Sequence, residues 1–288
     1  MSRGYIILAQ NSNTDDYIRM AYALALSIKN TQKTVNKVCL ATDIIPEKLD
    51  KKVRAVFDDI VPIPWIDHAK GSKWKIENTW KFYHMTPYDE TVVLDADMLF
   101  PTDISHWWDI LSKQDVWVTN KPKTFKGEII TSTKYRKVHV SNDLPNFHIA
   151  FFYFKKSELA AELFKFTEII FNNWERFFYN YLDETRPKYN SGDVAYALAI
   201  KLLGIENECF GNLDSVPSFV HMKGHLQNID EKFITEDWTK HIPTYFREDG
   251  GFKIGNYEQV LPFHYHIKEW LTDDIISILE KRLNNVNA

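Results

Sequence analysis

Two aspartates, Asp95 and Asp97, interrupt a strongly apolar stretch that runs from Thr91 to Phe100. Residues i and i+2 of a strand point to the same side, so we expect the two carboxylates to lie together. A pair of hard oxygen ligands suits Mg²⁺ or Mn²⁺, which also bind phosphate oxygens and would offset the cost of burying the charges. The simpler interpretation is that both aspartates only cap a turn. Their position directly after an apolar strand favours the metal interpretation.

The segments before this stretch alternate between strand and helix. We expect strands at 5–9, 37–42 and 59–65, with helices at 14–28 and 45–57 between them. This rhythm is typical of a parallel sheet covered by helices. Ligands of such sheets bind at the carboxyl ends of the strands, which is where the aspartate pair is expected to lie.

The rest of the chain supplies further apolar segments. We expect strands at 91–100, 115–120 and 147–155, and helices at 74–85, 157–177, 194–204 and 271–283. The stretch 121–138 is polar and lysine-rich without clear periodicity, and we interpret it as a surface excursion. No repeat or linker divides the chain into independent parts, so the pattern predicts an α/β fold with a C-terminal extension.

Composition narrows the class of protein. The chain has 288 residues, of which 44% are hydrophobic and 26% charged, as in an ordinary globular protein. Its net charge of -4 disfavours nucleic-acid binding. Only two cysteines occur, which favours a reducing compartment. Neither a signal peptide nor a membrane-spanning segment is apparent, so we expect a cytoplasmic protein without a membrane span.

The motifs also resemble a known family. "VVLDADMLF" (92–100) is similar to the DxD strand of glycogenin-like glycosyltransferases of family eight, and the first strand, turn and helix resemble their N-terminal unit. The resemblance implies a GT-A-like, Rossmann-like fold with a mixed, mostly parallel sheet flanked by helices. It also implies nucleotide contacts by Ala9, Asn11 and Tyr17, and Tyr17 could stack on the base.

Later segments carry less regular matches. "YNSGDVAYAL" (189–198) stands where the family has an acidic loop that contacts the sugar, and the resemblance assigns this role to Asp193 and Asn190. The alternative is that these are ordinary turn and helix-cap residues. In "FHIA" (147–150), His148 replaces the family's asparagine, and we expect it to assist in orienting the sugar.

A histidine is expected to complete the metal site. "FVHMKG" (219–224) resembles the family's His-x-x-Gly segment, which favours His221, although the Lys-Pro-Trp that usually follows is absent. "FHYHIKEW" (263–270) offers His264 as the alternative, since its two histidines alternate along an extended segment. Lys223 or Lys268 would then bind the departing diphosphate.

The sequence, together with this resemblance, predicts a glycosyltransferase that uses Mn²⁺ or Mg²⁺, takes its sugar from a nucleotide diphosphate such as UDP, and transfers it to a glycan, lipid or protein acceptor. The resemblance implies that the transfer retains the anomeric configuration. We expect a catalytic domain over 1–225 and an extension over 226–288 packed on the same domain; oligomerisation stays open. The alternatives are a sugar-phosphate nucleotidyltransferase, disfavoured because the turn after the first strand has neither Gly nor Lys, and a non-catalytic relative that binds a glycan or protein.

Overall fold

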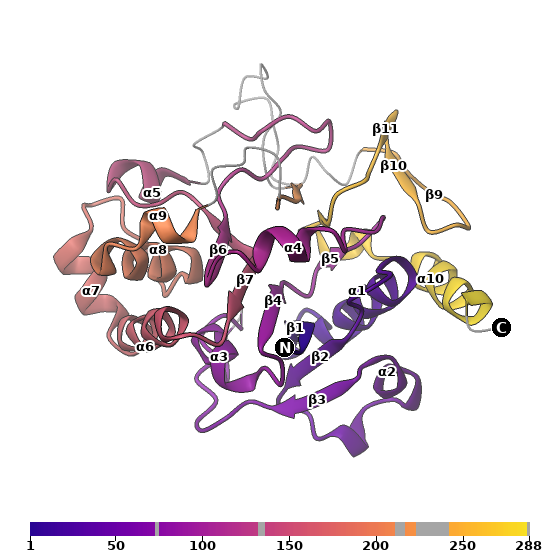
Figure 1. Cartoon of the computed structure of the whole chain (residues 1–288), viewed down its shortest axis with the longest axis horizontal. Helices are drawn as coiled ribbons and strands as arrows, with labels where there is room; N and C mark the ends of the chain where they lie inside the picture. Colours follow the sequence, from indigo (N-terminus) through magenta and orange to yellow (C-terminus); the bar gives the residue numbers. More distant parts are fainter. Residues whose placement is uncertain (73–74, 132–135, 211–216, 223–241, 287–288) are drawn as a thin grey trace.

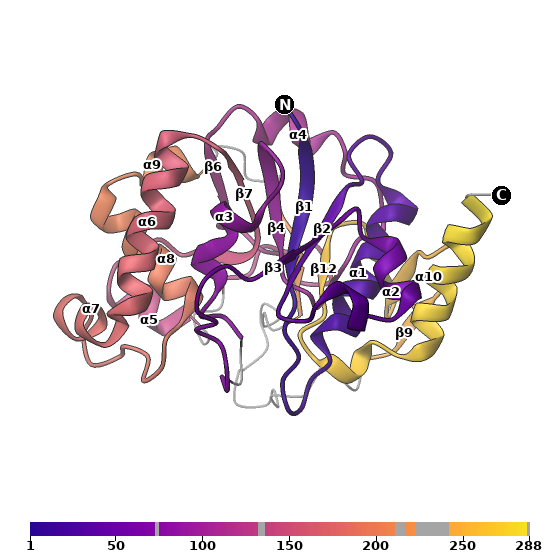
Figure 2. The same ribbon diagram turned by 90° about the horizontal axis from the view of Figure 1, so that it is seen from below.

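A six-stranded sheet forms the centre of the molecule (Figures 1 and 2). The structure is a computed structural model and describes residues 1–72, 75–131, 136–210, 217–222 and 242–286. In spatial order the strands of the sheet are β3 (Asp59–Pro62), β2 (Val38–Thr42), β1 (Arg3–Leu8), β4 (Glu90–Leu94), β7 (His148–Lys155) and β6 (Val116–Thr119).

The direction of the strands confirms the predicted fold class, a mixed and mostly parallel sheet flanked by helices. β3, β2, β1 and β4 pair in parallel. β7 is antiparallel to both of its neighbours, β4 and β6, so β6 runs in the same direction as the first four strands. The carboxyl ends of β1 and β4 therefore lie at one edge of the sheet, where the aspartate pair follows β4.

Helices cover both faces of the sheet, which explains why its strands are apolar throughout. Tyr5 and Ile7 of β1 point into one core, while Ile6 between them points into the other. Figure 2 shows the two layers on either side of the sheet. One layer contains α1 (Tyr17–Thr31), α2 (Lys51–Val56) and α10 (Asp273–Val286); the other contains α3 (Phe82–Met85), α6 (Glu158–Asn172) and α8 (Gly192–Leu203).

The C-terminal residues return to the N-terminal unit. α10 packs against α1, where Tyr22 donates a hydrogen bond to Glu280 (2.8 Å). β12 (Phe263–His264) lies between β5 (Met98–Leu99) and β8 (Val220–His221) in a small second sheet. β9 (Thr244–Phe246), β10 (Phe252–Ile254) and β11 (Tyr257–Glu258) form a third. The predicted boundary at 225/226 lies outside the described residues.

Several predicted elements are broken by local interactions. The helix predicted at 45–57 is a 3-10 turn η1 (Pro46–Lys48) followed by α2, because Asp50 caps a new helix by accepting from the Lys52 N–H (2.7 Å). The helix predicted at 157–177 starts at the predicted cap, Ser157, but stops at Asn172, and α7 (Trp174–Tyr181) follows.

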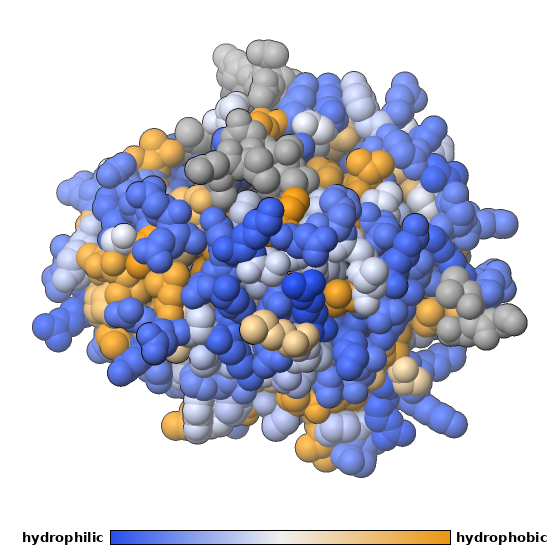
Figure 3. Space-filling view, viewed as in Figure 1, coloured by the Kyte–Doolittle hydropathy of each residue, from blue (hydrophilic) through white to orange (hydrophobic). Residues whose placement is uncertain are grey.

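The remaining short helices connect the main elements. They are η2 (Thr79–Lys81), α4 (Trp107–Leu111), α5 (Lys137–Ser141), α9 (Glu206–Cys209) and η6 (Lys268–Trp270). Within the described part of the helix predicted at 74–85, the helical turns are η2 and α3, and Trp74 lies outside the described residues. None of the helices in the described ranges is long and apolar enough to cross a lipid bilayer. Figure 3 shows a largely hydrophilic face on which apolar residues gather over α6, α7 and α8.

Candidate functional site

The two aspartates lie in the turn that joins β4 to β5. β4 ends at Leu94, and the Asp95 N–H still donates to the Ala150 carbonyl of β7 (3.1 Å). β5 pairs with β12 instead, and the Tyr265 N–H donates to the Asp97 carbonyl (3.2 Å). The prediction of one extended strand over 91–100 is therefore wrong, because a change of pairing partner turns the chain between the two carboxylates.

Asp97 is buried against the C-terminal segment. Its Oδ2 atom lies 3.0 Å from His264 Nε2 and accepts a hydrogen bond from Lys268 Nζ. The Lys268 ammonium also lies over the ring of Tyr17, 5.4 Å from the ring centroid. Tyr17 begins α1, so residues from the first helix, the β4–β5 turn and the last described strand meet at this carboxylate.

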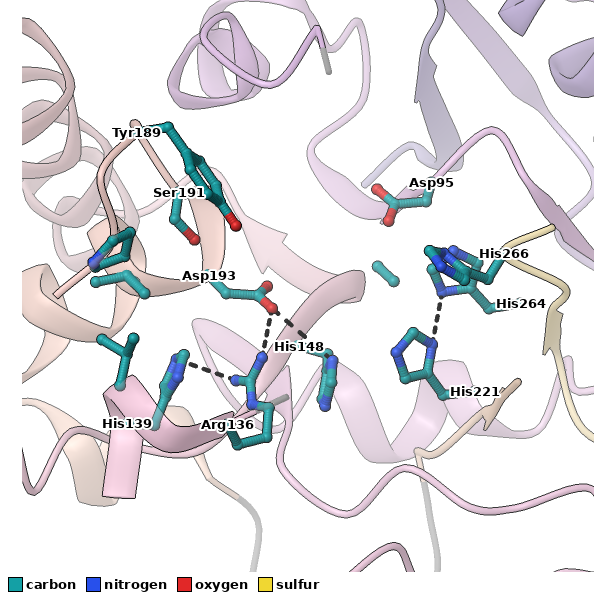
Figure 4. Close-up of a pocket in the computed structure, with 14 residues that line it drawn as sticks. Asp95, Arg136, His139, His148, Tyr189, Ser191, Asp193, His221, His264 and His266 are labelled. Atoms are coloured by element: carbon teal, nitrogen blue, oxygen red, sulfur yellow. Dashed lines mark hydrogen bonds and ion pairs between the residues drawn. The ribbon is translucent and has the colours of Figure 1, made fainter. Parts of the chain in front are cut away.

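Three histidines, His264, His221 and His148, lie in a row along a cavity (Figure 4). The ring centroids of His264 and His221 lie 4.8 Å apart, as do those of His221 and His148. His221 Nδ1 and His264 Nδ1 are hydrogen-bonded at 3.0 Å. Parallel pairing of β8 with β12 places His221 directly opposite His264. At the far end of the row, His148 Nδ1 lies 3.9 Å from Asp193 Oδ2.

Asp193 is held by an arginine from the segment before α5. Arg136 Nη1 donates to Asp193 Oδ2 (2.6 Å), and the Ile149 N–H donates to Asp193 Oδ1 (3.1 Å). The same guanidinium donates to Asn146 Oδ1 (2.7 Å) and contacts His139 Nε2 (3.0 Å). This network fixes the carboxylate in the first turn of α8, at the opposite side of the cavity from Asp95 (Figure 4).

The cavity between these groups has a volume of about 330 Å³, which is in the range of small-ligand sites. Asp95 reaches it from the β4–β5 turn, and Asp193 from the start of α8. Its other lining residues are Arg136, Val138, His139, His148, Ala150, Pro187, Tyr189, Ser191, Val194, His221, His264 and His266. The lining is thus polar and rich in histidine, as a binding site for a hydroxyl-bearing or anionic ligand requires.

The protonation of the acids follows from their surroundings. Burial raises the pKa of Asp95 to about 6, and the neighbouring carboxylates Asp97 and Asp193 add to this effect. For Asp97, burial acts in the same direction, but the charges and hydrogen bonds of His264 and Lys268 outweigh it and hold the pKa well below its ordinary value. These surroundings favour the charged form of Asp97, whereas they favour the protonated form of Asp95.

The nucleotide-contact candidates from the N-terminal unit lie beside the same edge of the sheet. Ala9 follows β1, is fully buried and donates its N–H to the Ala41 carbonyl (2.9 Å). Asn11 is exposed, and its Oδ1 accepts a hydrogen bond from the Ile18 N–H (3.0 Å). This bond holds the loop between β1 and α1 against the start of α1. Tyr17 is the candidate that reaches the Asp97 cluster, through Lys268.

Two other candidates lie away from the cavity or outside the described residues. Asn190 Nδ2 donates to the Phe171 carbonyl at the end of α6 (3.4 Å), while its neighbours Tyr189 and Ser191 line the cavity. Lys223 lies outside the described residues. Of the two lysines expected to bind the diphosphate, the structure therefore places only Lys268, which lies next to Asp97.

Sequence reasoning missed Arg136 and His139, which lie in or next to the polar stretch interpreted as a surface excursion. No periodicity marks them, so nothing in that stretch indicates a buried guanidinium. His266 alternates with His264 along the same segment, and this alternation is the sequence feature that could have indicated it as a metal ligand. Its backbone φ of +60° lies in the left-handed region, and the Ile267 N–H donates to the Tyr265 carbonyl in a tight turn around it.

The residues around Asp97 fit a divalent metal ion. In the part of the chain that the structure describes, the ligand atoms of Asp97, His264 and His266 all lie within 4.8 Å of one another. One carboxylate oxygen and two imidazole nitrogens suit Mn²⁺ and similar first-row ions better than Mg²⁺, which prefers oxygen. Asp95 lines the adjacent cavity and is a further candidate ligand.

Comparison with known proteins gives matches at the level of structure. No protein-family model matches the chain, and no curated protein matches it in sequence. Among solved structures, the apo form of the glycosyltransferase GlyE from Streptococcus pneumoniae TIGR4 is similar, with a TM-score of 0.44 and 12% identity. The match covers 74% of this chain but 45% of GlyE, so this chain spans less than half of that protein.

Two further structures are similar to comparable degrees. Mouse xyloside xylosyltransferase 1 matches with a TM-score of 0.46 and 9% identity, over 74% of this chain and 85% of its own. The galactosyltransferase LgtC, in complex with donor and acceptor sugar analogues, matches with a TM-score of 0.43 and 10% identity, over 73% of both chains. At these identities and TM-scores the likenesses carry no argument about what this chain does.

Proposed function

We propose that the protein is a metal-dependent glycosyltransferase that takes its sugar from a UDP-sugar and transfers it, with retention of configuration, to a glycan, lipid or protein acceptor. The observation that carries this proposal is the group of Asp97, His264 and His266 beside a polar cavity at the carboxyl end of β4. Nucleotide ligands of parallel sheets bind at this edge.

The metal ligands in this proposal are Asp97, His264 and His266, with Asp95 facing the same cavity. A bound divalent ion would neutralise the charge that develops on the leaving diphosphate. His221 is proposed to orient His264 through the contact between their Nδ1 atoms, because metal-binding histidines need a partner for their second ring nitrogen.

The opposite side of the cavity is proposed to hold the sugar. Asp193 presents a carboxylate whose orientation is fixed by Arg136 and the Ile149 N–H, and carboxylates of this kind accept hydrogen bonds from sugar hydroxyls. His148 lies between Asp193 and His221, where it can donate to or accept from the same hydroxyls. We assign no covalent nucleophile to these residues.

The proposal is tested by calorimetric titration of the protein with UDP in the presence and absence of Mn²⁺, followed by a screen for hydrolysis of UDP-sugars. We expect UDP to bind more tightly with Mn²⁺, and one UDP-sugar to release its sugar slowly. UMP is the control, because it lacks the diphosphate and its affinity should not depend on the metal. Turnover of a nucleoside triphosphate with a sugar phosphate would indicate a nucleotidyltransferase instead, and no nucleotide binding would refute the proposal.

A further inference from the structure

Lys268 pairs with the carboxylate that the proposed function assigns to a metal ion. Lys268 Nζ donates to Asp97 Oδ2, and that oxygen also lies 3.0 Å from His264 Nε2. Asp97 and His264 both belong to the group of candidate metal ligands. The Lys268 ammonium therefore balances the charge of Asp97, the same carboxylate that the proposed function assigns to a divalent ion.

The ion pair of Lys268 with Asp97 stabilises the protein in the absence of ligands. The Asp97 side chain is only 7% exposed, and an unpaired carboxylate at such a site is costly. The Lys268 side chain is 26% exposed and extends from the short helix η6. Its four-carbon stem can move the ammonium without any change in the backbone, whereas Asp97 is fixed in the β4–β5 turn.

We propose that Lys268 couples metal binding to nucleotide binding: it neutralises Asp97 in the empty protein, and it passes to the diphosphate when the ion binds. This inference rests on the proposed function. A divalent ion at Asp97 repels the adjacent ammonium, so binding of the ion alone has to break the ion pair. A diphosphate gives the displaced ammonium a new anionic partner, so each ligand strengthens the binding of the other.

Tyr17 lies beside the same ammonium. Lys268 Nζ lies over the tyrosine ring, 5.4 Å from the ring centroid. Tyr17 is also one of the three residues to which the family resemblance assigns nucleotide contacts. A nucleotide that contacts this ring brings its phosphates close to the ammonium, which can then exchange the protein carboxylate for the ligand phosphates.

The test uses the full chain and three variants, Lys268→Met, Lys268→Gln and the matched control Lys48→Met, which alters an exposed lysine far from the cavity in sequence. Mn²⁺ affinity is measured from the electron paramagnetic resonance signal of the free ion, with and without UDP. In the wild type we expect UDP to tighten Mn²⁺ binding. Both Lys268 variants should bind Mn²⁺ alone about tenfold more tightly than the wild type, and the coupling should fall by a similar factor.

Lys268→Gln keeps a hydrogen-bond donor beside Asp97 and serves if the methionine variant fails to fold, as judged by circular dichroism. If both folded variants bind Mn²⁺ alone no more tightly than the wild type does, the coupling role of Lys268 is wrong while the proposed function stands. If the wild type itself binds neither Mn²⁺ nor UDP, both the inference and the proposed function are wrong. Lys48→Met should match the wild type in every titration.

Discussion

The Asp97 carboxylate and the His264 imidazole lie 3.0 Å apart, although one residue follows the central strand β4 and the other ends the last strand of the described chain. Their meeting depends on the small sheet in which β12 pairs with both β5 and β8. This pairing brings the acid of an N-terminal motif to the histidines of a C-terminal one and creates the candidate metal site.

The three histidines near Asp97 should contribute unequally to metal binding. We expect His264→Ala and His266→Ala to weaken Mn²⁺ affinity by about 10- to 100-fold or more, and His221→Ala to weaken it less, because His221 contacts His264 rather than joining the ligand group. Titration of each variant with Mn²⁺ measures the order. A larger loss in His221→Ala would instead make His221 the ligand, as the family resemblance favours.

Arg136 should stabilise the fold through Asp193. Removal of one partner from a buried ion pair leaves an uncompensated charge, so Arg136→Met should lower the free energy of unfolding by about 3 kcal/mol. The control is Lys253→Met, which removes the exposed pair with Glu258 (3.9 Å) and should cost less than about 1 kcal/mol. Urea denaturation at neutral pH measures the free energy of unfolding of both variants. Equal losses in Arg136→Met and Lys253→Met would contradict a stabilising role of the pair between Arg136 and Asp193.

His139 should make stability depend on pH. Burial, together with the neighbouring charge of Arg136, lowers the pKa of His139 from 6.5 to about 4. Between pH 6.5 and pH 4, His139 binds a proton in the unfolded chain but not in the folded protein. The contribution of the neutral imidazole to the free energy of unfolding is therefore complete above pH 6.5 and is lost as the pH falls. We expect a loss of about 2 kcal/mol between pH 7 and pH 5 from this group.

The comparison of His139→Gln with the wild type isolates that contribution from other titrating groups. The variant should lose less stability than the wild type when urea denaturation is repeated at pH 7 and pH 5, since glutamine does not titrate. His106→Gln removes an exposed histidine and is the matched control. The interpretation fails if His139→Gln and His106→Gln show the same pH dependence.

Tyr17 should contribute to nucleotide affinity through its ring. Stacking of a base on an aromatic side chain contributes about 1–3 kcal/mol in nucleic-acid complexes, so Tyr17→Leu should weaken UDP binding by about tenfold or more. Tyr17→Phe keeps the ring and its face toward Lys268, and it should bind UDP nearly as well as the wild type. Calorimetric titration with UDP in saturating Mn²⁺ distinguishes the two; equal affinities for Tyr17→Leu and wild type contradict the assignment.

The N-terminal unit could be predicted from the sequence because its signals are local. The strands at 5–9 and 37–42 are apolar runs, and helical spacing separates them, so β1, α1 and β2 appear where the pattern indicates. Gly204 ends α8 with a φ of +68°, as a glycine after a helical run predicts. Each of these features depends on neighbours along the chain.

The site itself depends on contacts between distant segments, and such contacts leave no local signal. An apolar run with two aspartates reads as one strand, but β5 leaves the main sheet because β12 is available to pair with it. Arg136 lies in a polar stretch without periodicity, yet in the fold it is buried and pairs with Asp193 at the start of α8. The sequence thus indicated Asp95 and Asp97 as candidates, favoured His221 and offered His264 as the alternative, whereas Arg136 could be identified only from the fold.

The most direct test of the metal-dependent site is calorimetric titration of wild type and Asp97→Asn with UDP, each with and without Mn²⁺. Asparagine keeps the size of the side chain but removes the charge that the ion needs. We expect Mn²⁺ to strengthen UDP binding to the wild type by about tenfold or more and to have no effect on the folded Asp97→Asn variant. An undiminished effect of Mn²⁺ on UDP affinity in Asp97→Asn would contradict the proposed site.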